Sequence, residues 1–166
     1  MIIHNKDRLY LAESPWLFRL VGPESDVTDF SWSLDNSKVV VRALRGRKMA
    51  SALGTFDEIA AALQFPYYFG ENWGAFEECI NDLSWLPGGG YVLFVMDFAT
   101  VLAIESPDQL LVFLNILERT GQAWSKPIAL GEAWDRPSKP FHVVLHASNA
   151  DSDARLASIG LSIPSL

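Results

Sequence analysis

A continuous apolar run, from Tyr91 to Met96, restricts the possible folds of this chain more than any other stretch. Apolar residues without alternation are typical of a strand that is buried on both faces, as in a parallel sheet covered by helices. Two further runs, Lys38–Leu44 and Phe141–His146, are predicted as strands of the same core. Stretches with helical spacing separate the three, so we expect an α/β fold with a parallel sheet and right-handed crossovers.

Two of the intervening helices have recognisable ends. Thr55 and Glu58 form the pattern of a capping box, which predicts a helix that begins there. Pro66 ends this helix, because the residue before a proline is disfavoured in helical conformation. A later helix begins at Ser106-Pro107, with proline at its first position, and Gly121 lies where a C-terminal glycine is expected.

The most informative stretch runs from Phe65 to Leu83. It opens with four aromatic residues, turns at Gly70, where a positive φ is allowed, and continues as an amphipathic helix that Asn72 can cap. The apolar stripe of this helix consists of Trp73, Phe76, Ile80 and Leu83, at the spacing of a buried helical face. The opposite side carries Glu71, Gly74, Glu78 and Asp82, with Glu77 at the edge of the stripe.

The charge pattern around this helix has one sign. From Met49 to Glu118 the chain has no Lys or Arg but ten Asp or Glu residues, within a chain of net charge −7. A field of one sign accelerates association with a partner of the opposite sign. The alternative is an acidic surface that only maintains solubility.

At these residues the chain resembles the barstar family, the intracellular inhibitors of barnase-type ribonucleases. The resemblance is carried by the run Pro66-x-Tyr68-x-Gly70-Glu71-Asn72-x-x-Ala75-x-x-Glu78-Cys79 and by the order of the elements around it. It covers about residues 38–148. It implies a small three-stranded parallel sheet packed with helices, to which an N-terminal extension, residues 1–37, adds one or two strands. Residues 149–166 are expected to form a C-terminal helix and a tail.

The resemblance also implies a function and a site. The function is that of an antitoxin or immunity-type inhibitor, in the bacterial cytoplasm, of a basic extracellular ribonuclease whose cationic active site is blocked by the acidic helix. The predicted partner-binding residues are Tyr68, Gly70, Asn72, Gly74, Glu77, Glu78, Asp82 and Trp85. The alternative is a module of the same fold that binds a basic partner other than a nuclease.

Some positions depart from the family pattern. Gly74 replaces the first acid of the family helix, and Glu77 replaces the bulky aromatic residue before the second acid. Glu78 occupies the position of the second acid, which is an aspartate in the family, so its side chain is one methylene group longer. The acid of the family's last helix falls near Ile116, with Glu118 as the nearest substitute. These differences predict a target that differs from barnase.

No catalytic constellation is predicted. Cys79 lies at the edge of the apolar stripe and is interpreted as a core thiol. His142 and His146 lie on one face of a strand about 13 Å apart, too far to share a metal ion, and are interpreted as structural. We therefore predict no enzyme activity, cofactor or metal, and no binding to nucleic acid or membrane. The single cysteine and the lack of a signal-peptide pattern suggest a cytoplasmic protein. The oligomeric state is not predicted.

The remaining segments yield weaker expectations. Leu9–Leu11 and Trp16–Val21 are predicted as short strands, and Glu24–Ser37 as a loop or a weak third strand. Gly88–Gly90 is interpreted as a flexible connector. Gln122–Pro140 is a long connection whose two tryptophans favour an ordered loop, packed on the surface or offered to a partner. Four bases between Arg42 and Lys48 could indicate a phosphate site, but the preferred interpretation is a loop after the first strand whose positive charge offsets the acidic region. A short helix is expected over Asp151–Ile159, followed by a frayed tail.

Overall fold

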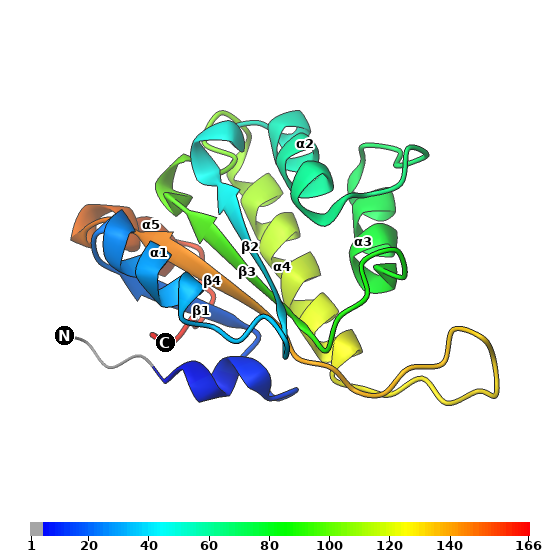
Figure 1. Cartoon of the computed structure of the whole chain (residues 1–166). Helices are drawn as coiled ribbons and strands as arrows, with labels where there is room; N and C mark the ends of the chain where they lie inside the picture. Colours follow the sequence, from blue (N-terminus) through cyan, green and yellow to red (C-terminus); the bar gives the residue numbers. More distant parts are fainter. Residues whose placement is uncertain (1–4) are drawn as a thin grey trace.

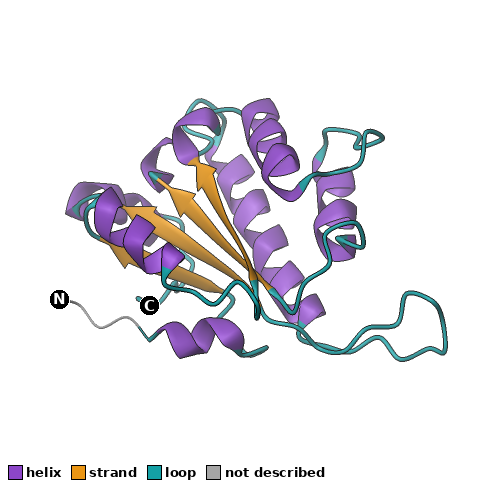
Figure 2. Cartoon of the chain, in the orientation of Figure 1, coloured by secondary structure: helices purple, strands orange, loops and turns teal. Residues whose placement is uncertain are grey.

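A single sheet of parallel strands organises the protein. The computed structural model describes residues 5–166, so residues 1–4 of the predicted extension lie outside the described residues. The strands are β1 (Leu17–Val21), β2 (Val40–Arg45), β3 (Tyr91–Met96) and β4 (Phe141–Ala147), in the spatial order β1-β4-β3-β2. All neighbouring pairs are parallel, as the arrows in Figure 2 show. The predicted three-stranded core is confirmed, and the extension adds one strand, β1, beside β4.

Helices cover both faces of this sheet (Figure 1). They are α1 (Glu24–Trp32), α2 (Ala52–Leu63), α3 (Trp73–Asp82), α4 (Pro107–Trp124) and α5 (Ala150–Ser158), with short 3-10 turns at Lys6–Tyr10, Gly46–Lys48 and Phe98–Thr100. The chain crosses the sheet from β1 to β2 and then returns through β3 to β4. Right-handed crossovers in opposite directions place their helices on opposite faces. This explains why α1 lies across the sheet from α2, α3 and α4.

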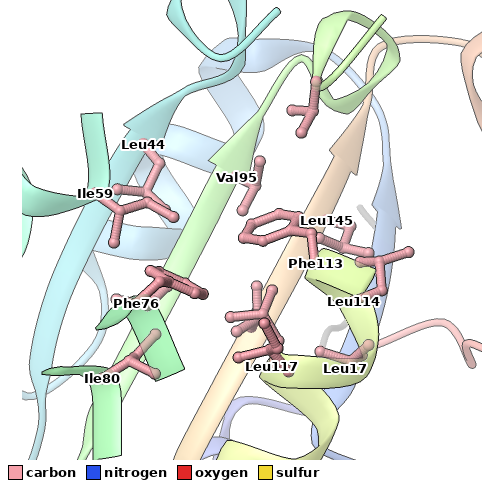
Figure 3. Close-up of a cluster of buried hydrophobic side chains, with 14 of the residues drawn as sticks. Leu17, Leu44, Ile59, Phe76, Ile80, Val95, Phe113, Leu114, Leu117 and Leu145 are labelled. Atoms are coloured by element: carbon pink, nitrogen blue, oxygen red, sulfur yellow. The ribbon is translucent and has the colours of Figure 1, made fainter. Parts of the chain in front are cut away.

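Each face has its own core. Val92, Phe94 and Val144 of the sheet pack against Val27 of α1 and Leu34 after it. The larger core lies on the other face, where side chains of β3 and β4 pack against α2, α3 and α4 (Figure 3). The side chains of β3 are fully buried from Tyr91 to Val95, as the apolar run in the sequence predicts.

The N-terminal extension differs from its prediction in two places. The strand expected at Leu9–Leu11 is wrong, because Lys6–Tyr10 forms a 3-10 helix that buries Leu9. The loop or strand expected at Glu24–Ser37 is also wrong. Alternation of apolar residues suggested a strand there, but Val27, Ser31 and Leu34 are the buried residues, at helical spacing. The aromatic side chain of Trp32, part of the alternating pattern, is 76% exposed.

Both predicted histidine roles fit the structure. His142 and His146 are fully buried on the face that the extension covers. The ring nitrogens of His142 lie 2.8 Å from the carbonyl oxygen of Leu11 and 3.1 Å from that of Pro15, and burial lowers the pKa of this side chain. The Asp97 N–H lies 3.1 Å from Nδ1 of His146. Through these contacts the two histidines connect β4 to the N-terminal extension and to the end of β3.

Two predicted helix ends are wrong. The cap of α2 is Ser51, whose side chain accepts a hydrogen bond from the Gly54 N–H, while Thr55 lies inside the helix and donates its hydroxyl to the Ser51 carbonyl. Gly121 does not end α4, which continues to Trp124. A Cβ atom at Gly121 would lie 2.5 Å from the Trp16 side chain, so the glycine permits close packing rather than termination.

The predicted flexible connector and frayed tail are both held by contacts. A Cβ atom at Gly89 would lie 2.4 Å from the Lys38 carbonyl oxygen, and one at Gly90 would lie 2.4 Å from Pro140. These glycines therefore allow close approach of neighbouring backbones. At the C-terminus, Arg19 of β1 donates its N–H to the Pro164 carbonyl and accepts from the Leu166 N–H. The tail thus pairs with the outer edge of β1.

Candidate protein-binding site

The local sequence fixes the start and the end of α3. The Asn72 side chain accepts a hydrogen bond from the Ala75 N–H at 2.9 Å and donates to the Gly70 carbonyl at 3.1 Å. It therefore caps the helix, as predicted, and closes the preceding turn. The left-handed residue of this turn is Glu71, with φ 49°, so the positive φ expected at Gly70 falls one residue later. Leu83, with φ 44°, ends the helix.

The apolar stripe anchors α3 to the rest of the molecule. Phe76 and Ile80 are fully buried beside the sheet-facing side chains of α4 (Figure 3). Trp73 packs edge-to-face on Phe56 of α2, with ring centroids 4.7 Å apart, and its indole N–H donates to the Gln109 side chain at 2.8 Å. These contacts hold the helix in one orientation, so its outward face is presented in a fixed geometry.

The outward face carries unpaired carboxylates. Glu71, Gly74, Glu78 and Asp82 are all exposed, on the side opposite the buried stripe. Within the described part of the chain, the ion pairs are Arg19–Asp153, Arg45–Glu58 and Arg119–Glu77, and none includes these carboxylates. Glu78 therefore faces solvent without an ion pair to any cation of residues 5–166. A carboxylate in this state is available for charge-assisted hydrogen bonds to another protein.

Glu77 is in a different situation. Its two carboxylate oxygens accept hydrogen bonds from the Arg119 guanidinium of α4, at 2.9 and 3.1 Å. Hydrogen bonding to Glu77 raises the pKa of Arg119. Because Glu77 is turned toward α4 and its charge is already compensated, the structure does not bring it together with Glu78. Its predicted contact with a partner stays a prediction.

Exposed aromatic side chains lie beside the acidic face. Tyr67 and Tyr68 pack edge-to-face, 5.8 Å apart, and are 101% and 66% exposed. Of the two, only Tyr68 is among the predicted site residues. Trp85 is half-buried, packs on Phe65, and donates its indole N–H to the Leu63 carbonyl at 2.9 Å. Trp85 therefore supports the loop, while the two tyrosines present their rings to solvent.

The two site glycines differ from those of the core. A Cβ atom at Gly74 would meet only the Asn72 side-chain oxygen, at 3.3 Å, and one at Gly70 would meet the Asn72 side-chain nitrogen at 3.2 Å. Neither position is closely covered by the backbone of another element. The fold therefore does not require a glycine at position 74, and its effect is to leave a gap in the exposed face between Glu71 and Glu78.

Cys79 is a core thiol, as predicted. It is 6% exposed, and burial raises its pKa, with further increases from the Asp82 and Glu78 carboxylates. A thiol with a raised pKa is a poor nucleophile. In the described residues, His, Cys, Asp and Glu side chains form no cluster of three or more that could hold a metal ion. No helix in residues 5–166 has the length and apolar character needed to cross a membrane.

The sequence matches the model of a known protein family. The model of the family described as "Barstar (barnase inhibitor)" matches residues 39–146, which include the whole acidic face of α3. None of the curated proteins matches the chain.

Proposed function

Because the chain belongs to the Barstar family of barnase inhibitors, we propose that it is an intracellular inhibitor of a barnase-like ribonuclease. In this proposal the exposed face of α3 enters the cationic active site of the nuclease, where its carboxylates occupy the positions of substrate phosphates. The protein would thereby protect the cytoplasm of the cell that makes the nuclease, a compartment that suits a chain with one buried thiol.

The observation that carries the proposal is the state of Glu78. This carboxylate is exposed at the centre of a rigidly packed helix, and no cation of the described chain pairs with it. Ribonuclease active sites use Lys, Arg and His side chains to bind phosphate, and such groups form strong hydrogen bonds with carboxylates. The exposed pair Tyr67 and Tyr68 adds aromatic contact area, which is typical of binding hot spots.

The departures from the family pattern favour a nuclease other than barnase itself. Gly74 removes the first acid of the family helix, and Glu77, which replaces an aromatic residue of the family, pairs with Arg119 of its own chain. The same differences also support the second candidate function, a module that binds a basic protein without nuclease activity. The two are separated by whether the chain inhibits any barnase-type ribonuclease.

The test is the inhibition of a panel of barnase-type ribonucleases by the wild-type chain and by Glu78→Gln. For a nuclease that the wild type inhibits, the substitution is expected to weaken binding by more than about 1 kcal/mol, because it removes a charge that pairs in the complex. The matched control is Glu24→Gln, the same change at an exposed position of α1 on the other face of the sheet. Equal inhibition by Glu78→Gln and wild type would contradict the assigned role.

A further inference from the structure

The connection between α4 and β4 forms a hairpin that is anchored at its base. Ile128 and Arg136 exchange two backbone hydrogen bonds, of 2.8 and 3.0 Å. The Arg136 guanidinium stacks 4.0 Å above the Trp124 ring and donates to the carbonyls of Ala123 and Lys126. The Ala123 carbonyl lies in the last turn of α4, where carbonyls have no partner four residues further along the helix, and Lys126 lies just after the helix. The base is therefore an ordered extension of α4, as the two tryptophans suggested.

The tip of the hairpin, between Ile128 and Arg136, projects from the molecule (Figure 1). Side-chain hydrogen bonds within the tip hold its backbone. The Asp135 carboxylate accepts hydrogen bonds from the N–H groups of Leu130 and Gly131, at 2.9 and 2.7 Å, and these bonds lower its pKa. Leu130 is nevertheless 72% exposed and Trp134 is 64% exposed. The hairpin thus holds two large apolar side chains in solvent, although connections from a helix to the next strand usually need only a few residues.

The hairpin continues the acidic face of α3. A hollow of about 510 Å³ separates the two, and it is lined by Asp82 and Ser84 at the end of α3, by Tyr91 and Trp124, and by Trp134 and Arg136 of the hairpin. In Figure 1 the hairpin projects on the side of the molecule that carries α3, away from α1. Asp82, on the exposed side of α3, and Trp134 of the hairpin therefore line the same hollow.

We propose that the hairpin is a second arm of the protein-binding surface, and that the hollow takes a Lys or Arg side chain of the same basic partner that α3 binds. This inference rests on the proposed function. A cation in the hollow would lie near the Asp82 carboxylate, which has no ion pair in the described chain, and beside the Trp134 side chain, whose ring can attract a cation. The two cations that line the hollow are engaged elsewhere: Arg136 with carbonyls of α4, and Lys139 with the Gly88 carbonyl.

Two features of the hairpin favour the basic partner of α3 as its binding partner: the hairpin lies next to α3, and it is ordered before any partner binds. A partner that covers α3 with an interface of ordinary size extends beyond a helix of ten residues. The hairpin lies next to the end of that helix, and its backbone is already held by hydrogen bonds, so the backbone loses little freedom on binding. A second copy of this chain, in contrast, would bring an acidic surface against another acidic surface.

The experiment measures binding of a ribonuclease that the wild type inhibits, with Trp134→Ala, Asp82→Asn and Glu78→Gln. Trp134→Ala and Asp82→Asn are each expected to weaken binding about tenfold or more, in keeping with a hot-spot tryptophan and its paired charge. The control is Trp32→Ala, which removes a tryptophan of similar exposure from α1, on the other face of the sheet, and is expected to bind as the wild type does. Circular dichroism and thermal unfolding verify that each variant is folded.

The possible failures are distinguishable. If Glu78→Gln weakens binding while Trp134→Ala and Asp82→Asn do not, the proposed function stands and the second arm is refuted. If no nuclease is inhibited by the wild type, the proposed function fails and this inference fails with it. If Trp134→Ala alters only self-association in analytical ultracentrifugation, the hairpin is a contact between copies, which also overturns the inference.

Discussion

At the scale of single residues, two glutamates on neighbouring helices have different roles because their surroundings differ. Glu78 of α3 faces solvent, whereas Glu58 of α2 is 7% exposed and accepts three hydrogen bonds of 2.9 Å from Arg45, one from its backbone and two from its guanidinium. Arg45 ends β2, which is an edge strand. The Glu58 carboxylate therefore closes part of an edge that would otherwise expose an unpaired backbone N–H.

The Glu58–Arg45 contact predicts a pH-dependent contribution to stability. Hydrogen bonding from Arg45 lowers the pKa of Glu58 below its ordinary value of 4.5, so the folded state favours the ionised form. The contribution is present above the unfolded pKa and is lost as the pH falls through the folded pKa. Glu58→Gln should cost about 1 kcal/mol at pH 7, since Arg45 is more than half exposed and solvent weakens the pair.

The measurement is urea unfolding of the wild type and Glu58→Gln at pH 7 and at about pH 3, which is below the unfolded pKa of a glutamate. The difference in unfolding free energy between the two proteins should shrink at the lower pH. Other carboxylates titrate in both proteins, so only this difference reports on Glu58. A difference that stays constant between the two pH values would contradict the assignment.

At the scale of the elements, α4 connects the site to the rest of the fold. One side of this helix packs on α3 and pairs Arg119 with Glu77, and another part meets the N-terminal segment where Gly121 contacts Trp16. The end of the same helix anchors the hairpin through Trp124 and Arg136. The orientation of the acidic face and the position of the hairpin therefore depend on the same helix.

Gly121 provides a direct test of this packing. An alanine favours a helix interior over glycine by about 1 kcal/mol, but its Cβ atom would lie 2.5 Å from Trp16. We expect Gly121→Ala to destabilise the protein by about 1–3 kcal/mol, because overpacking outweighs helix propensity. The measurement is chemical unfolding, with Gln122→Ala at the exposed neighbouring position as control. A stabilised Gly121→Ala variant would show that the helix does not pack closely on Trp16.

The elements differ in how far local sequence determines them. The helix α3 was predictable because its apolar stripe, its Asn72 cap and its exposed Glu78 all follow from spacing within one segment. The helix α1 was not, because Pro23 gives no side-chain cap and the alternation around Trp32 resembles a strand. The pairing of Glu77 with Arg119 depends on the packing of two helices, and the hairpin depends on Asp135 and Arg136 reaching backbone groups elsewhere. Such contacts leave no periodic signal in the sequence.

At the scale of the whole molecule, the two faces of the sheet are covered by different parts of the chain. One face is closed by the N-terminal extension, which includes α1, and the buried His142 and His146 bind carbonyl groups of this extension. The other face supports α3, whose outward side lies in the section without Lys or Arg. The cations of the chain thus lie outside the section that forms the acidic helix. In the fold, Arg119 of α4 pairs with Glu77, while Glu71, Glu78 and Asp82 form no ion pair among the described residues and give the outward side of α3 a negative field.

The claim that α3 occupies the active site of a ribonuclease is tested most directly by competition. Calorimetry would measure binding of the wild-type chain to an inhibited nuclease, with and without a nucleoside monophosphate that fills the nuclease active site. If the two ligands exclude each other, the dissociation constant of the complex should rise about tenfold at a nucleotide concentration ten times the nucleotide's own dissociation constant. A dissociation constant unchanged by the nucleotide would place the chain elsewhere on the nuclease and would contradict the account.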